Sequence, residues 1–271
     1  MITLLRKAVA FVKRDYRIES GYKANFFMTI FQSLSLLVFF YFLGRLITPG
    51  NSADLGVFGG RYFPYAVIGL AFARYFDLTL KMFSESIRNA QMTGCLEAML
   101  SSQTGCVSIV LMSSLYALLS GAVQLLLILV AGVIAFGVDL SRMNVMATLL
   151  VLALSIAIFV GFGVLSAATV VWLKKGDPIT WILGGFGSVL GGAYFPIDVM
   201  PAWMQKVSLI IPITYSLDAL RLTMLKGYSV SLIAKPVTTL AGIAVILLPA
   251  SIALFAAAVR NGRKEGTLMQ Y

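Results

Sequence analysis

Residues 184–227 read GGFGSVLGGAYFPIDVMPAWMQKVSLIIPITYSLDALRLTMLKG, a glycine-dense apolar run followed by three closely spaced prolines, Pro196, Pro201 and Pro212. A proline lacks the backbone N–H donor and disturbs a helix interior, so one straight helix cannot run through this stretch. The stretch predicts short broken helices over 199–233, separated at Pro212, at a membrane face. A structural hairpin is the alternative interpretation.

The composition predicts an all-α integral membrane protein. The 271 residues are 59% hydrophobic and only 12% charged, far from the average of soluble domains. Six apolar blocks reach the roughly 20 residues that a spanning helix needs. They cover 24–48, 62–82, 105–137, 143–173, 179–198 and 234–259. An even number of spans places both termini on one side of the membrane.

The net charge of +10 is explained by orientation in the membrane and does not indicate nucleic-acid binding. The basic residues sit at span ends, and no soluble domain remains to form a nucleic-acid-binding groove. One side of the six-span arrangement carries Arg6, Lys7, Lys13, Arg14, Arg17, Lys23, Arg88, Lys174, Lys175, Arg260, Arg263 and Lys264. By the positive-inside rule this side is the cytoplasm. We therefore expect a multi-pass protein of the cell membrane with cytoplasmic N- and C-termini.

The segment 1–20 predicts an amphipathic helix that lies in the membrane interface. Between residues 4 and 17, apolar side chains recur at helical spacing while basic ones take the other side. The basic side chains would meet anionic lipid headgroups of the cytoplasmic leaflet. Such a helix is either a lever that links a peripheral partner to the first span or a passive anchor, and the sequence leaves both open.

The second predicted span carries a stripe of alternating charges. Its members are Arg74, Asp77, Lys81, Glu85 and Arg88. Steps of three and four residues keep them on one helical face, and a charge at the bilayer centre costs about 2.5–3.5 kcal/mol on insertion scales. The stripe is therefore expected to face protein or water. It is either the polar lining of a transport path or a self-paired stripe that packs the bundle, and we favour the second interpretation.

The run YFPIDVMPAWMQKVSLIIPITYSLDALR, residues 194–221, resembles the signature of ABC-2-type exporter permeases. The matching residues are Pro196, Asp198, Pro201, Trp203, Pro212, Thr214, Tyr215, Asp218, Ala219 and Arg221, while Ile211 stands where many members have Asn. The resemblance implies one transmembrane domain over 1–271 in a prokaryotic inner membrane. It also implies a second copy of this chain or a paralogous permease, and two copies of an ABC ATP-binding subunit.

The cytoplasmic segment 89–104 is similar to the coupling segment of the same family. The run GCLEAML resembles the short helix that docks into the ATP-binding subunit, which would assign coupling to Gly94, Leu96, Glu97, Met99 and Leu100. An ordinary cytoplasmic turn is the alternative.

Several chemical functions are excluded by missing residues. The chain has no histidine and no phosphate-binding G-x-x-x-x-G-K-(S/T) loop. Its two cysteines, Cys95 and Cys106, are too few for a structural zinc site, and no nucleophile and base form a catalytic constellation. We expect no catalytic residue, no metal and no cofactor in this chain, with ATP and magnesium bound by the partner subunit.

The sequence favours an exporter of a hydrophobic or amphipathic substrate, such as a drug, a lipid or a lipid-linked glycan. The FPID motif at 195–198 looks closer to drug exporters than to O-antigen permeases of the family. A polysaccharide permease remains an alternative. So does an ion-coupled transporter, which would need broken helices in both halves of the chain. A lipid-modifying enzyme would need a polar cluster, for which only Asp198 and Asp218 are near each other.

Overall fold

The computed structural model describes residues 2–21, 23–46, 62–92, 94, 106–173 and 177–264, and every regular element in these ranges is a helix. The long helices are α1 (Ile2–Ser20), α2 (Lys23–Leu46), α3 (Tyr62–Met92), α6 (Leu115–Phe136), α7 (Val145–Leu173) and α12 (Ala234–Lys264). The shorter ones are α5 (Cys106–Ser113), α8 (Pro178–Thr180), a π-helical turn (Trp181–Phe186), α9 (Gly187–Leu190), a 3-10 turn (Ile197–Val199), α10 (Ala202–Ser208) and α11 (Pro212–Leu225).

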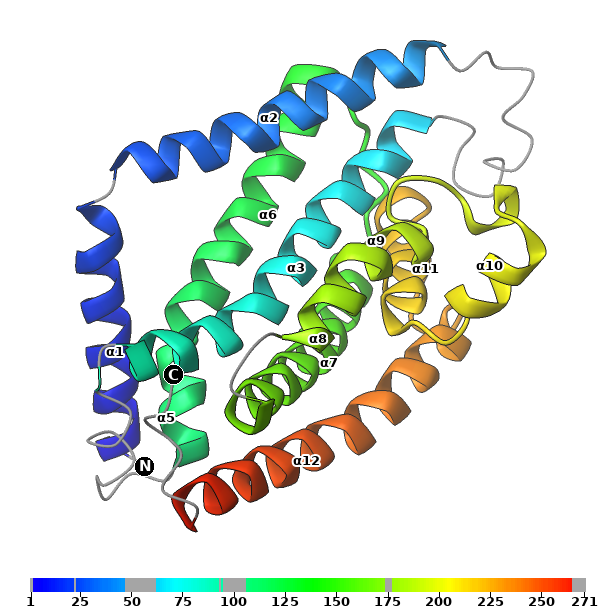
Figure 1. Ribbon diagram of the computed structural model, residues 1–271. Coiled ribbons are helices and arrows are strands. Elements are labelled where there is room, and N and C mark those ends of the chain that lie inside the picture. Colours follow the sequence, from blue (N-terminus) through cyan, green and yellow to red (C-terminus); the bar gives the residue numbers. More distant parts are fainter. Residues whose placement is uncertain are drawn as a thin grey trace.

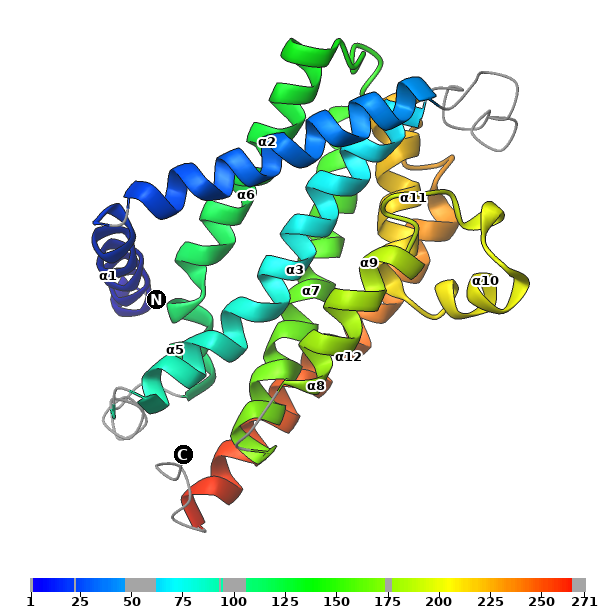
Figure 2. The ribbon, with the colours of Figure 1, turned by 45° about the horizontal axis from the view of Figure 1, so that its top comes forward.

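The long helices form a bundle with two distinct ends. Figure 1 shows the start of α1 and the end of α12 at the same end, at the lower left of the view. The short helices α10 and α11 lie toward the opposite end, where α12 begins. Figure 2 shows α3, α7 and α12 running in the same general direction.

In the described residues, four helices are long and apolar enough to cross a membrane: Phe27–Leu46, Ser108–Phe136, Val145–Leu173 and Ala234–Gly262. The expected second span, α3, has 31 residues but is not among them. Its charged residues and tyrosines lower its hydropathy. The expected fifth span, 179–198, is shorter than predicted, because the apolar helix Pro178–Leu190 stops at the glycine pair 191–192 and a turn follows.

The break at Pro212 is present. Helices α10 and α11 are separated by a few residues and bent by 86° relative to each other. Ile211 is extended, as expected for the residue before a proline, and Pro212 takes the first turn of α11, where the missing N–H costs no helical bond.

The core of the bundle is built around α3. Residues 65–73 of this helix are all buried, and α3 contacts α2, α6, α7 and α11. Phe72 and Phe76 pack against Phe159 of α7, with ring centroids 5.3 Å and 4.6 Å apart. The part of α3 that precedes its charged residues is therefore surrounded by the other helices.

Gly69 lets the backbone of another segment touch α3. A Cβ atom on Gly69 would lie 1.7 Å from the carbonyl oxygen of Ala193 and 2.6 Å from Nη2 of Arg221. Small residues serve such close approach in membrane proteins, where packing replaces the hydrophobic drive between helices. The contact joins α3 to the turn after α9.

Gly69→Ala is expected to destabilise the protein by at least about 1–3 kcal/mol, the usual cost of overpacking, since the atom that the methyl group meets belongs to the backbone. The matched control is Gly242→Ala in α12, where nothing lies within 4 Å of the new Cβ. Alanine is the better helix former, so this control should be neutral or stabilising. Equal thermal denaturation midpoints of the two variants in detergent would contradict the close approach.

Candidate functional site

The turn after α9 leaves backbone carbonyl groups without helical partners. The helix ends at Leu190, and Gly192 takes a φ of 76°, in the left-handed region that favours glycine. The carbonyl groups of Gly192, Ala193 and Tyr194 lie beyond the helix end. A buried carbonyl group needs a hydrogen-bond donor, and lipid supplies none.

Two tyrosines of α3 supply part of the donors. The Tyr65 hydroxyl donates to the carbonyl oxygen of Gly192 at 2.9 Å, and the Tyr62 hydroxyl donates to that of Tyr194 at 3.0 Å. Neither tyrosine stands out in the sequence. Their only signal is the spacing of 62, 65 and 69, which places both tyrosines on the same helical face as the small residue that permits the contact.

Arg221 of α11 supplies the remaining donor. Its Nη2 donates to the carbonyl oxygens of Gly192 at 2.9 Å and Ala193 at 3.0 Å. The guanidinium carbon lies 3.4 Å from the ring centroid of Tyr65, a cation–π contact in a site where Arg221 is fully buried. Asp218, one turn earlier in α11, adds a favourable opposite charge. We call Arg221, Tyr62 and Tyr65, with the carbonyl groups of residues 192–194, the Arg221 cap.

The other residues of the predicted signature lie on the surface, are buried, or close a turn. Asp198, Pro201 and Trp203 are exposed, whereas Pro196 and Pro212 are buried. The Tyr215 hydroxyl donates to the carbonyl oxygen of Leu209 at 2.8 Å and so closes the turn between α10 and α11. The structure thus brings Asp218 and Arg221 to the cap, but leaves Asp198, Pro201 and Trp203 on the surface.

Arg221→Lys should weaken the cap, because an ammonium group lacks the planar face that stacks on Tyr65 while Nη2 donates to both carbonyl groups. The expected loss is about 1–3 kcal/mol of stability, with faster protease cleavage near residues 192–200. Arg142→Lys, the same change at an exposed position, is the control and should stay within about 0.5 kcal/mol of wild type. If both variants have the stability and the cleavage rate of wild type, Arg221 does not stabilise the turn.

The charged stripe of α3 contacts α2 and the helix interrupted by the π turn. Nη2 of Arg74 donates to Oε1 of Gln32 in α2 at 2.9 Å. The Asp77 carboxylate lies beside Gly184 and Ser188, so that a Cβ on Gly184 would be 3.3 Å from Oδ1. In the part of the chain that the structure describes, no ion pair joins two members of the stripe. Its polar partners therefore come from other helices.

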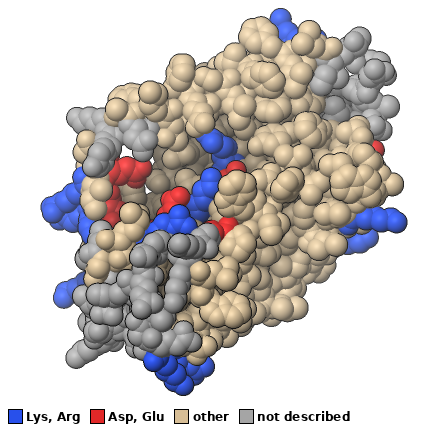
Figure 3. Space-filling view, in the orientation of Figure 1, with Lys and Arg blue, Asp and Glu red and all other residues tan. Residues whose placement is uncertain are grey.

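The stripe lies in a recess. Figure 3 shows basic and acidic atoms together in a hollow, at the place where Figure 1 shows α3 between α2 and α8. Arg74, Asp77 and Arg88 are partly buried, while Lys81 and Glu85 are exposed. The π-helical turn beside Asp77 is of a kind that often marks functional sites.

Asp177 fixes the connection between α7 and α8, outside the candidate spans. Its carboxylate caps α8 by accepting from the Thr180 backbone N–H at 3.0 Å, and it also accepts from the hydroxyls of Thr180 at 2.6 Å and Ser166 at 2.5 Å. Burial alone would raise the pKa of Asp177, but these hydrogen bonds outweigh burial and hold the pKa below its ordinary value. The ionised form is therefore stabilised in the folded protein.

A depressed pKa in the folded state means that Asp177 stabilises the protein above the unfolded pKa of about 3.9 and loses this effect as the pH falls through the lower folded value. Wild type should accordingly be more stable than Asp177→Asn at neutral pH, and the difference should shrink below about pH 4. Thermal denaturation of both proteins between pH 7 and pH 3 measures it. A difference that stays constant with pH would rule out the carboxylate as its source.

Most of the predicted coupling segment lies outside the described residues. This applies to Leu96, Glu97, Met99 and Leu100. Gly94 is described: its φ is 67°, and its N–H donates to the carbonyl oxygen of Gln91 at 3.0 Å, so it ends α3. No group of three or more potential metal ligands occurs in the described ranges.

Comparison with known proteins identifies one family. The sequence model of the family described as ABC-2 type transporter matches residues 5–225, which include most of α1, the stripe, the Arg221 cap and α11. No curated protein matches the chain.

Proposed function

Because the chain belongs to the ABC-2 type transporter family, we propose that it is the transmembrane permease subunit of an ATP-driven exporter, powered by a separate ATP-binding subunit. The family match over residues 5–225 is the observation that carries this proposal. The missing phosphate-binding loop supports a separate source of ATP hydrolysis, because a chain that uses ATP must hold its phosphates.

We infer a topology of six passes with both termini in the cytoplasm of a prokaryotic cell. In this topology α3 crosses despite its charges, at about 46 Å for 31 residues, and the helix 178–190 enters the membrane from the cytoplasmic side. Helices α10 and α11 then lie at the external face. The charges of α3 are compatible with a crossing if they face the recess instead of lipid, since charged side chains in membrane proteins face protein or water-filled cavities.

The recess over α3 is the candidate transport path for a hydrophobic or amphipathic substrate such as a drug, a lipid or a lipid-linked glycan. The polar residues in this recess favour a transport path over simple helix packing, because Asp77 and Lys81 form no ion pair with each other. A polysaccharide permease of the same family is the alternative. An ion-coupled transporter is less well supported, since α2 and α3 run unbroken while the interruptions concentrate in the C-terminal half.

The complex would pair this chain with a second copy or a paralogous permease, and with two ATP-binding subunits. The helix 181–186 exposes Trp181, Ile182 and Phe186, and α2 exposes Phe31 and Phe42. They are candidates for the contact between permeases, since large exposed apolar side chains suit an interface with another subunit.

Reconstituted with its ATP-binding subunit, the protein should show substrate-stimulated ATP hydrolysis, and without that subunit it should show none. Leu96→Asp and Leu100→Asp should lower transport and stimulated hydrolysis strongly, because each would bury an unpaired charge in the docking groove. Glu97→Ala should have a smaller effect.

Leu232→Asp is the control for these variants, since Leu232 is exposed in the loop before α12. It should leave both activities near wild type. ATP hydrolysis by the pure chain would contradict the proposed function. Wild-type activity in all coupling variants would instead reject only the assignment of this segment.

A further inference from the structure

A cavity separates α1 from the first part of α6. Its volume is about 460 Å³, within the range of ligand pockets in proteins. Val9, Val12 and Tyr16 line it from α1, and Leu119 and Val123 line it from α6. In Figure 2, α1 is seen almost end-on beside the lower part of α6.

The apolar side chains that line this cavity are largely exposed, although α1 and α6 contact each other. Val9 and Tyr16 are 58% and 60% exposed, and Leu119 and Val123 are 52% and 51% exposed. The two helices meet at Tyr16 and Tyr116, whose rings pack edge to face at 6.4 Å. An unfilled gap forfeits dispersion contacts on both walls, so a lipid chain is a favourable occupant.

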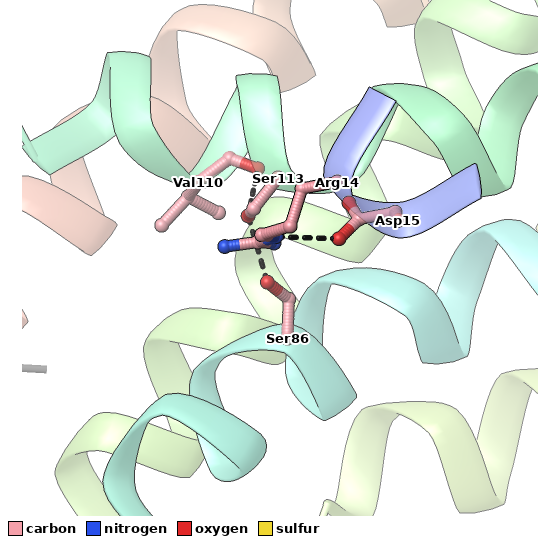
Figure 4. A network of polar contacts seen from close by, with 5 residues as sticks. All are labelled: Arg14, Asp15, Ser86, Val110 and Ser113. Carbon is pink, nitrogen blue, oxygen red and sulfur yellow. Dashed lines mark hydrogen bonds and ion pairs between the residues drawn. The ribbon is translucent and has the colours of Figure 1, made fainter. Parts of the chain in front are cut away.

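Among the residues that line the cavity, Lys13 offers a positive charge to an anionic headgroup. Lys13 lines the cavity together with Glu19. Glu19 is engaged by the Tyr116 hydroxyl, and Asp15 is held in an ion pair with Arg14 at 2.7 Å. Figure 4 shows this ion pair beside the junction of α3 and α5, where Ser86 and Ser113 share a hydrogen bond of 2.7 Å.

Helix α1 as a whole carries an excess of positive charge. Over 2–20 it carries five basic residues, Arg6, Lys7, Lys13, Arg14 and Arg17, against two acidic ones, Asp15 and Glu19. It lies at the end of the bundle where α12 also ends with Arg260 and Lys264 (Figure 1). Clustered basic side chains at a membrane surface attract anionic lipids.

We propose that this cavity is a binding site for an anionic phospholipid, with one acyl chain between α1 and α6 and the phosphate against Lys13. The lipid fills the gap between the two helices and thereby holds α1 against the bundle. The site is separate from the recess over α3, and the inference does not depend on the substrate or on the proposed transport activity.

Native mass spectrometry of the full-length protein tests the site with phosphatidylglycerol and phosphatidylcholine of identical acyl chains as probes. Wild type should retain phosphatidylglycerol in preference to phosphatidylcholine. Lys13→Gln should lower retention of phosphatidylglycerol about threefold or more, as expected for a partly exposed charge contact. Arg6→Gln removes the same charge from α1 outside the cavity lining and should lower retention less.

A second pair of variants tests the apolar part. Val123→Trp fills the cavity and should abolish the retained lipid, whereas Leu127→Trp, on an exposed face of α6 outside the lining, should not. Equal retention in Lys13→Gln and Arg6→Gln would overturn the proposal, as would equal retention of the two lipids by wild type. If Val123→Trp fails to fold, the comparison of Lys13→Gln with Arg6→Gln decides.

Discussion

The hydrogen bonds between Arg221 and the carbonyl groups of Gly192 and Ala193 are the constraint on which the rest of the structure depends. A helix that ends inside a bundle leaves acceptors that lipid cannot satisfy, so the chain must bring its own donors. A guanidinium group suits this task because its Nη2 donates to two acceptors while its planar face stacks on Tyr65. The positive charge also lies at the end of a helix, where it is favourable. Gly69 then has to be small, since the same carbonyl group approaches the backbone of α3.

Local chemistry made several features predictable from the sequence. Pro212 predicts a break, since it starts a helix and cannot continue one, and α10 and α11 are separated there. Family membership could also be recognised from the signature at 194–221, and the match over residues 5–225 confirms it. The polar partners of α3 were not predictable. Gln32 and Ser188 are ordinary residues until folding places them beside Arg74 and Asp77.

Hydropathy is a poor guide to the membrane spans for two of the six predicted blocks. Hydropathy measures how a helix meets lipid, but α3 meets mostly other helices, so its charges say little about its place in the bundle. The fifth apolar block forms a shorter helix than predicted for another reason. Its apolar run to residue 198 is continuous in composition, yet the glycine pair 191–192 ends the helix. The N–H groups of Gly192 and Ala193 donate back to the helix, and the Arg221 cap binds the carbonyl groups beyond it.

The cap can form only late in the synthesis of the protein, because its residues lie far apart in the chain. The contacts that hold α3 come from residues 192–194 and from Arg221, more than a hundred positions later in the chain. While α3 leaves the ribosome, its tyrosines and charges have none of these partners, and its low hydropathy gives it little tendency to stay in lipid alone. The carbonyl groups of Gly192 and Ala193 gain their Arg221 donor only when α11 has been made. The turn that packs on α3 is thus completed by α11, so a truncated chain that lacks α11 leaves these carbonyl groups without their arginine donor.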